Sequence, residues 1–155
     1  MNMVERAIAD RPISDLTTVK KKLDDILPLI EANAELAETQ RQPVDAVISA
    51  LEETGIFRAF VPKRYGGLEI DLNSFIDLGL AVSECCTSTG WVTTFYMEHN
   101  WILAQFSQAA QEAIFSQQPY VLAPASISPN GQAHRMENSY RLSGRWAWGT
   151  GVMHA

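Results

Sequence analysis

The sequence has few cysteines, little positive charge and no long apolar run, and each shortage excludes a class of protein. Its only two cysteines among 155 residues, Cys85 and Cys86, are neighbours. A disulfide between adjacent residues is strained, and one pair of thiols makes neither a disulfide framework nor a metal site. We therefore predict reduced thiols, no bound metal and a cytoplasmic location.

The charge balance is acidic, with 12 Lys and Arg against 18 Asp and Glu, for a net charge of -6. Basic residues cluster only at Lys20–Lys22, beside acidic residues, so we predict no nucleic-acid partner. No run of about 20 apolar residues occurs. Glu5 and Arg6 stand where a secretory signal needs apolar residues. We therefore predict no membrane partner and no secretory signal.

What the sequence does contain is a series of helical patterns over its first three quarters. Apolar residues recur at helical spacing, and Pro28 is expected to break or kink the first helix or to open a new turn. Candidate helix ends are Ser14, Gly55, Asp71 or Asn73, and Ser88 or Thr89. We predict an all-helical domain over residues 1–117.

The composition changes after residue 117. Two strands are predicted over Gln132–Met136 and Tyr140–Leu142, around a tight turn, and Trp146–Trp148 is expected to begin a third. Two or three strands cannot bury a core of their own. The predicted fold is therefore α+β, with residues 118–155 as the incomplete beginning of a β domain.

The stretch Thr89–Trp101 combines a helical pattern with many aromatic residues. Trp91, Phe95 and His99 recur every fourth position and so share one helix face. A helix that is apolar on most sides is expected to be buried. His99 then has two interpretations, as a core histidine satisfied by its packing or as a titratable group in a pocket.

Two motifs resemble the acyl-CoA dehydrogenase superfamily. One is Val61–Leu68, which contains the P-x-x-Y-G-G pattern of a loop in that superfamily, and the other is Arg141–Gly151, which resembles a strand pair of the superfamily. Members of this superfamily have an N-terminal helical domain, a middle β-barrel and a C-terminal four-helix bundle, and are usually tetramers. The resemblance implies that residues 118–155 begin an antiparallel β-barrel, that the bundle is absent from this chain, and that the full-length protein is a homo-oligomer.

The segment Ser88–Trp91, followed by His99, looks like the flavin-dependent monooxygenase branch of that superfamily. The loop Ala123–Gln132 lacks the acidic residue and terminal Asp of the dehydrogenases. This branch resembles the oxygenase component of two-component aromatic hydroxylases. The resemblance implies an enzyme that uses O2 and reduced FMN or FAD, supplied by a flavin reductase, to hydroxylate a small aromatic or phenolic substrate.

The resemblance also implies roles for individual residues. His99 and Ser126 take catalytic roles at the substrate hydroxyl. The substrate pocket consists of Trp91, Phe95 and His99, and the flavin-binding residues are Ser126, Trp148, Thr150 and Gly151. Each has a simpler alternative: Trp91 and Trp148 as core residues, Ser126 as a turn residue and Thr150 as a strand residue at a bend. His134 is expected at the surface, and His154 is expected to be exposed.

Two other functions stay open at this point. The shared fold is equally that of an acyl-CoA dehydrogenase, which oxidises a thioester with FAD. Alternatively, the 155 residues act without catalysis, as a helical oligomerisation module, because an incomplete barrel leaves strand edges and apolar faces open.

Overall fold

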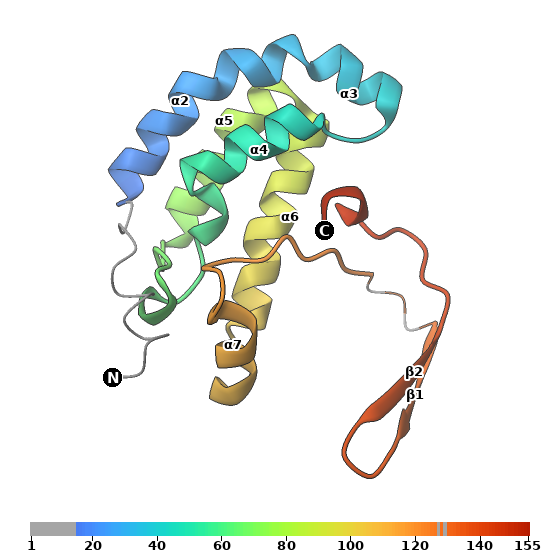
Figure 1. The fold of residues 1–155 in the computed structure, drawn as a ribbon. Coiled ribbons are helices and arrows are strands. Elements are labelled where there is room, and N and C mark those ends of the chain that lie inside the picture. Colours follow the sequence, from blue (N-terminus) through green and yellow to red (C-terminus); the bar gives the residue numbers. More distant parts are fainter. Residues whose placement is uncertain (1–14, 127, 129) are drawn as a thin grey trace.

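A computed structural model describes residues 15–126, 128 and 130–155, and it has an α+β fold in which helices precede a two-stranded antiparallel hairpin (Figure 1). The described helices are α2 (Leu16–Ala32), α3 (Ala34–Gln40), α4 (Asp45–Thr54), α5 (Leu72–Cys85), α6 (Thr87–Leu103) and α7 (Gln108–Phe115). Short 3-10 turns are η1 (Ile56–Arg58), η2 (Lys63–Tyr65) and η3 (Val152–His154). The predicted fold class is confirmed. In the described part of the chain, no helix has the length and apolar character needed to cross a membrane.

Several helix ends lie where the sequence predicts them. Asp71 caps α5 by accepting from the Ser74 N–H at 3.0 Å, and Gly55 ends α4 in the left-handed conformation, with φ 85°. The predicted cap Ser14 lies outside the described residues, and Asp15 caps α2. The predicted start of α6 at Ser88 or Thr89 is wrong, because the helix begins at Thr87 directly after Cys86.

The expected interruption at Pro28 is also wrong, because α2 continues through this residue to Ala32. A proline removes a single helical hydrogen bond, and α2 is held on both sides of it by the buried residues Leu23 and Ile30. The helix instead ends at Asn33, whose side-chain amide donates to the Leu29 carbonyl at 2.8 Å. Packing of the apolar face therefore outweighs the local preference of proline.

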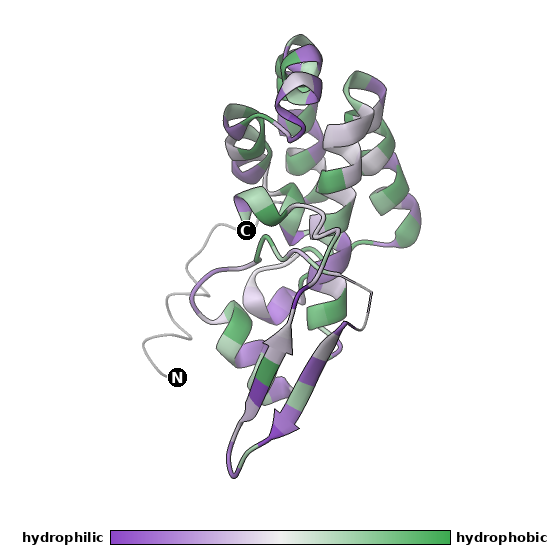
Figure 2. Cartoon of the chain, turned by 90° about the vertical axis from the view of Figure 1, so that its right-hand side faces the viewer, coloured by the Kyte–Doolittle hydropathy of each residue, from purple (hydrophilic) through white to green (hydrophobic). Residues whose placement is uncertain are grey.

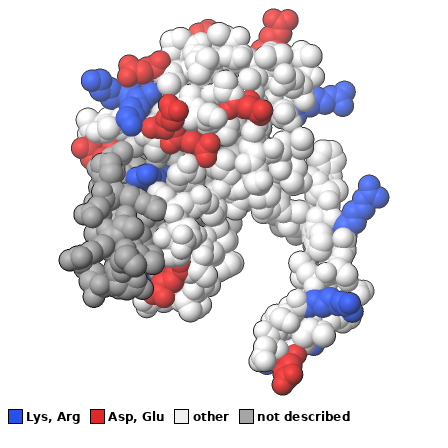
Figure 3. All heavy atoms as spheres, viewed as in Figure 1, with Lys and Arg blue, Asp and Glu red and all other residues white. Residues whose placement is uncertain are grey.

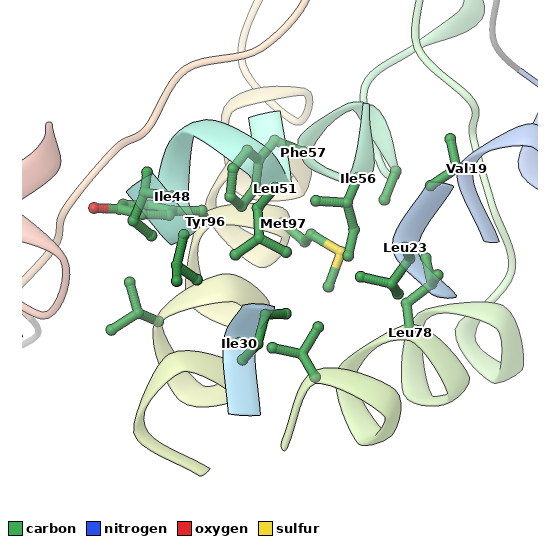
Figure 4. Packing of buried hydrophobic residues seen from close by; sticks show 14 of the residues in the cluster. Val19, Leu23, Ile30, Ile48, Leu51, Ile56, Phe57, Leu78, Tyr96 and Met97 are labelled. Carbon is green, nitrogen blue, oxygen red and sulfur yellow. The ribbon is translucent and has the colours of Figure 1, made fainter. Parts of the chain in front are cut away.

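The core forms where one face of α6 packs against α5 and η1, and buried residues of α4 belong to the same cluster. Tyr96 and Met97 of α6 are fully buried, and Figure 4 shows them beside Leu51 and Phe57. The rings of Phe57 and Tyr96 meet edge to face, with centroids 5.5 Å apart. Gly79 brings two helices close together: a Cβ at this position would lie 2.7 Å from Thr94 of α6.

The expectation that α6 is buried on most sides is wrong. Its buried face carries Tyr96, Met97 and small residues, whereas Trp91 is 60% exposed and Trp101 is 50% exposed. The helices α3 and α5 and the turn η1 cover only part of the circumference of α6, so its aromatic face remains at the surface of the described residues (Figures 1 and 2).

The hairpin consists of β1 (Gly131–Arg135) and β2 (Tyr140–Gly144), with Gly131 opposite Gly144. Both predicted strands are confirmed to within two residues. The hairpin extends away from the helices (Figure 1), and β2 is exposed along its whole length. The predicted third strand is reduced to one antiparallel bridge, between Ala125 and Thr150. Two strands bury no core, as expected.

The loop Val61–Leu68 depends on its second glycine. A Cβ at Gly67 would lie 1.8 Å from the Val61 carbonyl oxygen. No side chain fits there without a shift of the backbone. At Gly149, by contrast, an added Cβ would meet nothing closer than the Val152 Cβ at 3.5 Å.

We expect Gly67→Ala to lower the free energy of unfolding by about 2 kcal/mol, because the added methyl group overpacks a fixed backbone contact. The matched variant Gly149→Ala should change it by less than about 0.5 kcal/mol. Urea denaturation followed by circular dichroism measures both. Equal effects of the two substitutions on the free energy of unfolding would show that the close approach at Gly67 does not restrict this position to glycine.

Candidate functional site

A row of three aromatic side chains runs along the open face of α6. The ring centroids of Trp91 and Phe95 are 5.2 Å apart, and those of Phe95 and His99 are 4.8 Å apart, nearly perpendicular at 76°. The shared face predicted from their spacing is confirmed. Trp91 is 60% exposed and His99 only 7% exposed, so the row leads from solvent to a buried histidine.

One nitrogen of His99 is fixed by the backbone. Its Nδ1 lies 2.5 Å from the carbonyl oxygen of Ala123, and because a carbonyl only accepts, Nδ1 donates the proton. In the neutral ring Nε2 is then unprotonated and accepts hydrogen bonds. Among the residues that the structure describes, none forms a hydrogen bond with this Nε2. The ring is therefore anchored at one nitrogen and available at the other.

Asn100, which the sequence interpretation missed, fixes the segment that supplies this carbonyl. Its side chain is fully buried, and Oδ1 accepts from the Val121 N–H at 3.0 Å. Nδ2 donates to the carbonyls of Val121 at 2.9 Å and of Tyr96 at 2.8 Å. The signal was present: an asparagine inside an apolar helix is a poor helix former and needs hydrogen-bond partners when buried.

The later candidate residues lie on the continuation of this segment or on the stretch that pairs with it. Thr150 forms its bridge with Ala125, and Ser126 Oγ donates to the Ala147 carbonyl at 2.9 Å. Ser126 therefore links two distant segments, which goes beyond its alternative role as a local turn residue. The Thr150 hydroxyl has no hydrogen-bond partner within the described ranges.

Gly151 joins these segments to α6, because its carbonyl accepts a short hydrogen bond from the Tyr96 hydroxyl. Its φ is 79°, and a Cβ there would lie 2.7 Å from the Tyr96 ring, so only glycine fits. The structure thus brings His99, Ser126, Thr150 and Gly151 onto adjoining segments.

Trp148 is placed differently. Its side chain is 91% exposed, and its backbone has φ 61°, a conformation rare for residues other than glycine. The alternative that Trp148 fills a core is therefore wrong, as it is for Trp91. His134 is exposed, as expected, but the expectation that His154 is exposed is wrong. Its side chain is 8% exposed and its Nε2 lies 3.1 Å from Asp45 Oδ1.

Two phenols lie near the aromatic row, Tyr96 fully buried and Tyr120 partly buried. The Tyr120 hydroxyl donates to Glu52 Oε1 at 3.0 Å. Burial, and then the charge of Glu52, raises the pKa of Tyr96 and of Tyr120 to about 12. Both hydroxyls therefore remain neutral hydrogen-bond donors at neutral pH, and Tyr96 keeps its contact with Gly151.

The surface around the site is largely uncharged. On the face seen in Figure 3, charged side chains gather over α2 and α4 and along the hairpin, and the surface between the helices and the hairpin carries few. A groove of about 460 Å³ at the N-terminal end of α6 includes Trp91 and Arg41 in its lining. His99 does not line this groove.

Comparison with known proteins identifies relatives. Residues 18–117 match the family model of the acyl-CoA dehydrogenase N-terminal domain. The chain is 35% identical, over 147 residues, to the oxygenase component of p-hydroxyphenylacetate 3-hydroxylase from Acinetobacter baumannii, which covers 95% of the chain and 35% of that relative.

Two solved structures have the same fold. The 3-HSA hydroxylase from Rhodococcus sp. RHA1 superposes with a TM-score of 0.84 at 36% identity, over 89% of this chain and 36% of that one. XiaF from Streptomyces sp., solved in complex with FADH2 and glycerol, gives a TM-score of 0.84 at 25% identity, over 99% of this chain and 38% of that one. The chain therefore spans little more than a third of the length of these relatives.

The raised pKa values of Tyr96 and Tyr120 predict a loss of stability at alkaline pH. The two neutral phenols contribute fully to the free energy of unfolding below pH 10.0, the ordinary pKa. This contribution is lost as the pH rises to about 12, because the phenols ionise more readily in the unfolded state than in the folded state. Urea midpoints of the wild type should fall over this range more steeply than those of the double variant Tyr96→Phe, Tyr120→Phe. Parallel pH profiles would contradict the assignment.

Proposed function

The chain belongs to the acyl-CoA dehydrogenase family through its N-terminal domain, and from this premise we propose that it forms the first part of a flavin-dependent monooxygenase. The proposed substrate is a small aromatic or phenolic compound. The observation that carries the proposal is His99, anchored at Nδ1 by the Ala123 carbonyl and open at Nε2 at the end of an aromatic row.

The relatives support the same class of reaction. One is the oxygenase component of p-hydroxyphenylacetate 3-hydroxylase, and another was solved with FADH2. We propose that this protein likewise takes reduced FMN or FAD from a separate flavin reductase, with O2 as co-substrate. Because the chain spans 35% of the first of these relatives, the activity is proposed for the complete gene product.

The proposed role of His99 follows from its geometry. Nε2, which bears no proton in the neutral ring, accepts the hydroxyl proton of a phenol and so makes the aromatic ring richer in electrons. Phe95 meets the imidazole edge to face at 4.8 Å and keeps the ring in position. Trp91, 60% exposed, offers an indole face on which a substrate ring can pack.

The residues proposed for the flavin offer groups that suit it. The Thr150 hydroxyl is not engaged by any described residue, and Trp148, 91% exposed, presents an indole face to a flat ring. Ser126 holds its segment against Ala147 at 2.9 Å, close to Trp148 in the sequence. When bound, reduced flavin would supply the electrons for O2 activation, while the protein residues bind, orient and exclude water.

The test uses the complete gene product with a flavin reductase, NADH and a panel of phenols. His99→Ala should lower kcat/KM for hydroxylation by about a hundredfold or more, as expected for loss of a general base. Oxidation of NADH should continue, with peroxide released. His134→Ala, which changes an exposed histidine of the hairpin, is the matched control and should retain activity within about twofold.

Hydroxylation by the His99→Ala variant at the wild-type rate would sink the assigned role. Absence of any hydroxylated product from a folded wild-type protein would sink the proposed function itself. Bleaching of bound FAD by an acyl-CoA thioester, in the same preparation, would favour the dehydrogenase alternative.

A further inference from the structure

We propose that Asn100 is the positioning residue that sets the tautomer of His99. The catalytic benefit of this tautomer rests on the proposed function. The contacts that set the tautomer lie within this chain. His99 and Asn100 are neighbours on α6, and both bond the extended segment Val121–Ala123: His99 bonds the carbonyl of Ala123, and Asn100 bonds both the N–H and the carbonyl of Val121. The two side chains therefore bind the same segment from consecutive positions of one helix.

The pairing of Asn100 with Val121 has the pattern of a strand ladder. The carboxamide accepts from the Val121 N–H at 3.0 Å and donates to the Val121 carbonyl at 2.9 Å. Carbonyls two residues apart in an extended chain point to the same side. Once Val121 is held in this way, the carbonyl of Ala123 also points at α6, where His99 Nδ1 meets it at 2.5 Å.

Burial makes these hydrogen bonds decisive for the position of the proton on His99. Asn100 is fully buried and His99 is 7% exposed, so water does not readily replace a lost partner. The third hydrogen bond of Asn100, from Nδ2 to the Tyr96 carbonyl at 2.8 Å, ties the carboxamide to its own helix and fixes which edge faces Val121. The carbonyl delivered to Nδ1 keeps the proton there, and Nε2 is left as the nitrogen that can accept a substrate proton.

The variant that isolates this pairing is Asn100→Ser. A serine keeps a bond to the carbonyl four residues earlier, as Ser83 does to Gly79 at 2.7 Å. The serine side chain is too short to reach both the N–H and the carbonyl of Val121. Thr93→Val is the matched control, because Thr93 is equally buried on α6 and also bonds the carbonyl four residues earlier, Thr89 at 2.8 Å, without touching the Val121 segment.

Nitrogen-15 NMR of the imidazole, in the chain without flavin or substrate, reads the tautomer directly. In the wild type and in Thr93→Val we expect a single neutral form with the proton on Nδ1. In Asn100→Ser we expect both nitrogens to move toward average shifts, and the Val121 amide proton to exchange about tenfold faster or more, as loss of a buried hydrogen bond implies.

A proton on Nε2 in the wild type, or a single Nδ1-protonated form that persists in Asn100→Ser, would overturn the inference. If Asn100→Ser does not fold, the wild type is measured in increasing concentrations of urea below the unfolding midpoint. The protection of the Val121 amide and the single His99 tautomer should then be lost together. A single tautomer that persists after the Val121 protection is lost would overturn the inference. Since no readout requires catalysis, a negative hydroxylation assay with these NMR results intact would refute the proposed function alone.

Discussion

The packing of one face of α6 is the constraint on which the rest of the structure depends. Gly79 lets α5 approach Thr94, and Tyr96 and Met97 occupy the core beside Phe57. A helix held this tightly on one side cannot rotate. The aromatic row on the opposite side is therefore presented in a fixed orientation, although few of its own contacts hold it there.

The same helix joins the parts of the candidate site that are distant in sequence. Through the Asn100 side chain it holds Val121, and through the Tyr96 hydroxyl it holds Gly151, while His99 bonds Ala123. Irregular segments that would otherwise carry unsatisfied backbone groups thus find partners on α6. One helix accordingly contributes to the core on one face, anchors the chain after α7, and displays the histidine proposed to act on a phenol.

Local signals in the sequence predicted much of the fold. Asp71 and Gly55 mark helix ends because capping chemistry is local, and the spacing of Trp91, Phe95 and His99 fixed their shared face. The predicted interruption at Pro28 was wrong because packing of the apolar face of α2 outweighed the local effect of the proline. The burial of α6 was overestimated because apolar character does not tell which face finds a neighbour. The Asn100–Val121 pairing was not predicted, because partners 21 residues apart leave no periodic pattern.

The positions of the tryptophans give the chain an unusual optical property. All four lie at the surface, with exposures of 60% for Trp91, 50% for Trp101, 41% for Trp146 and 91% for Trp148. The buried aromatic side chains of the described residues are instead Phe57, Tyr65, Tyr96 and Phe115. Intrinsic tryptophan emission therefore reports weakly on unfolding and strongly on whatever covers the open face of α6, which makes the chain its own fluorescent reporter of flavin or substrate association.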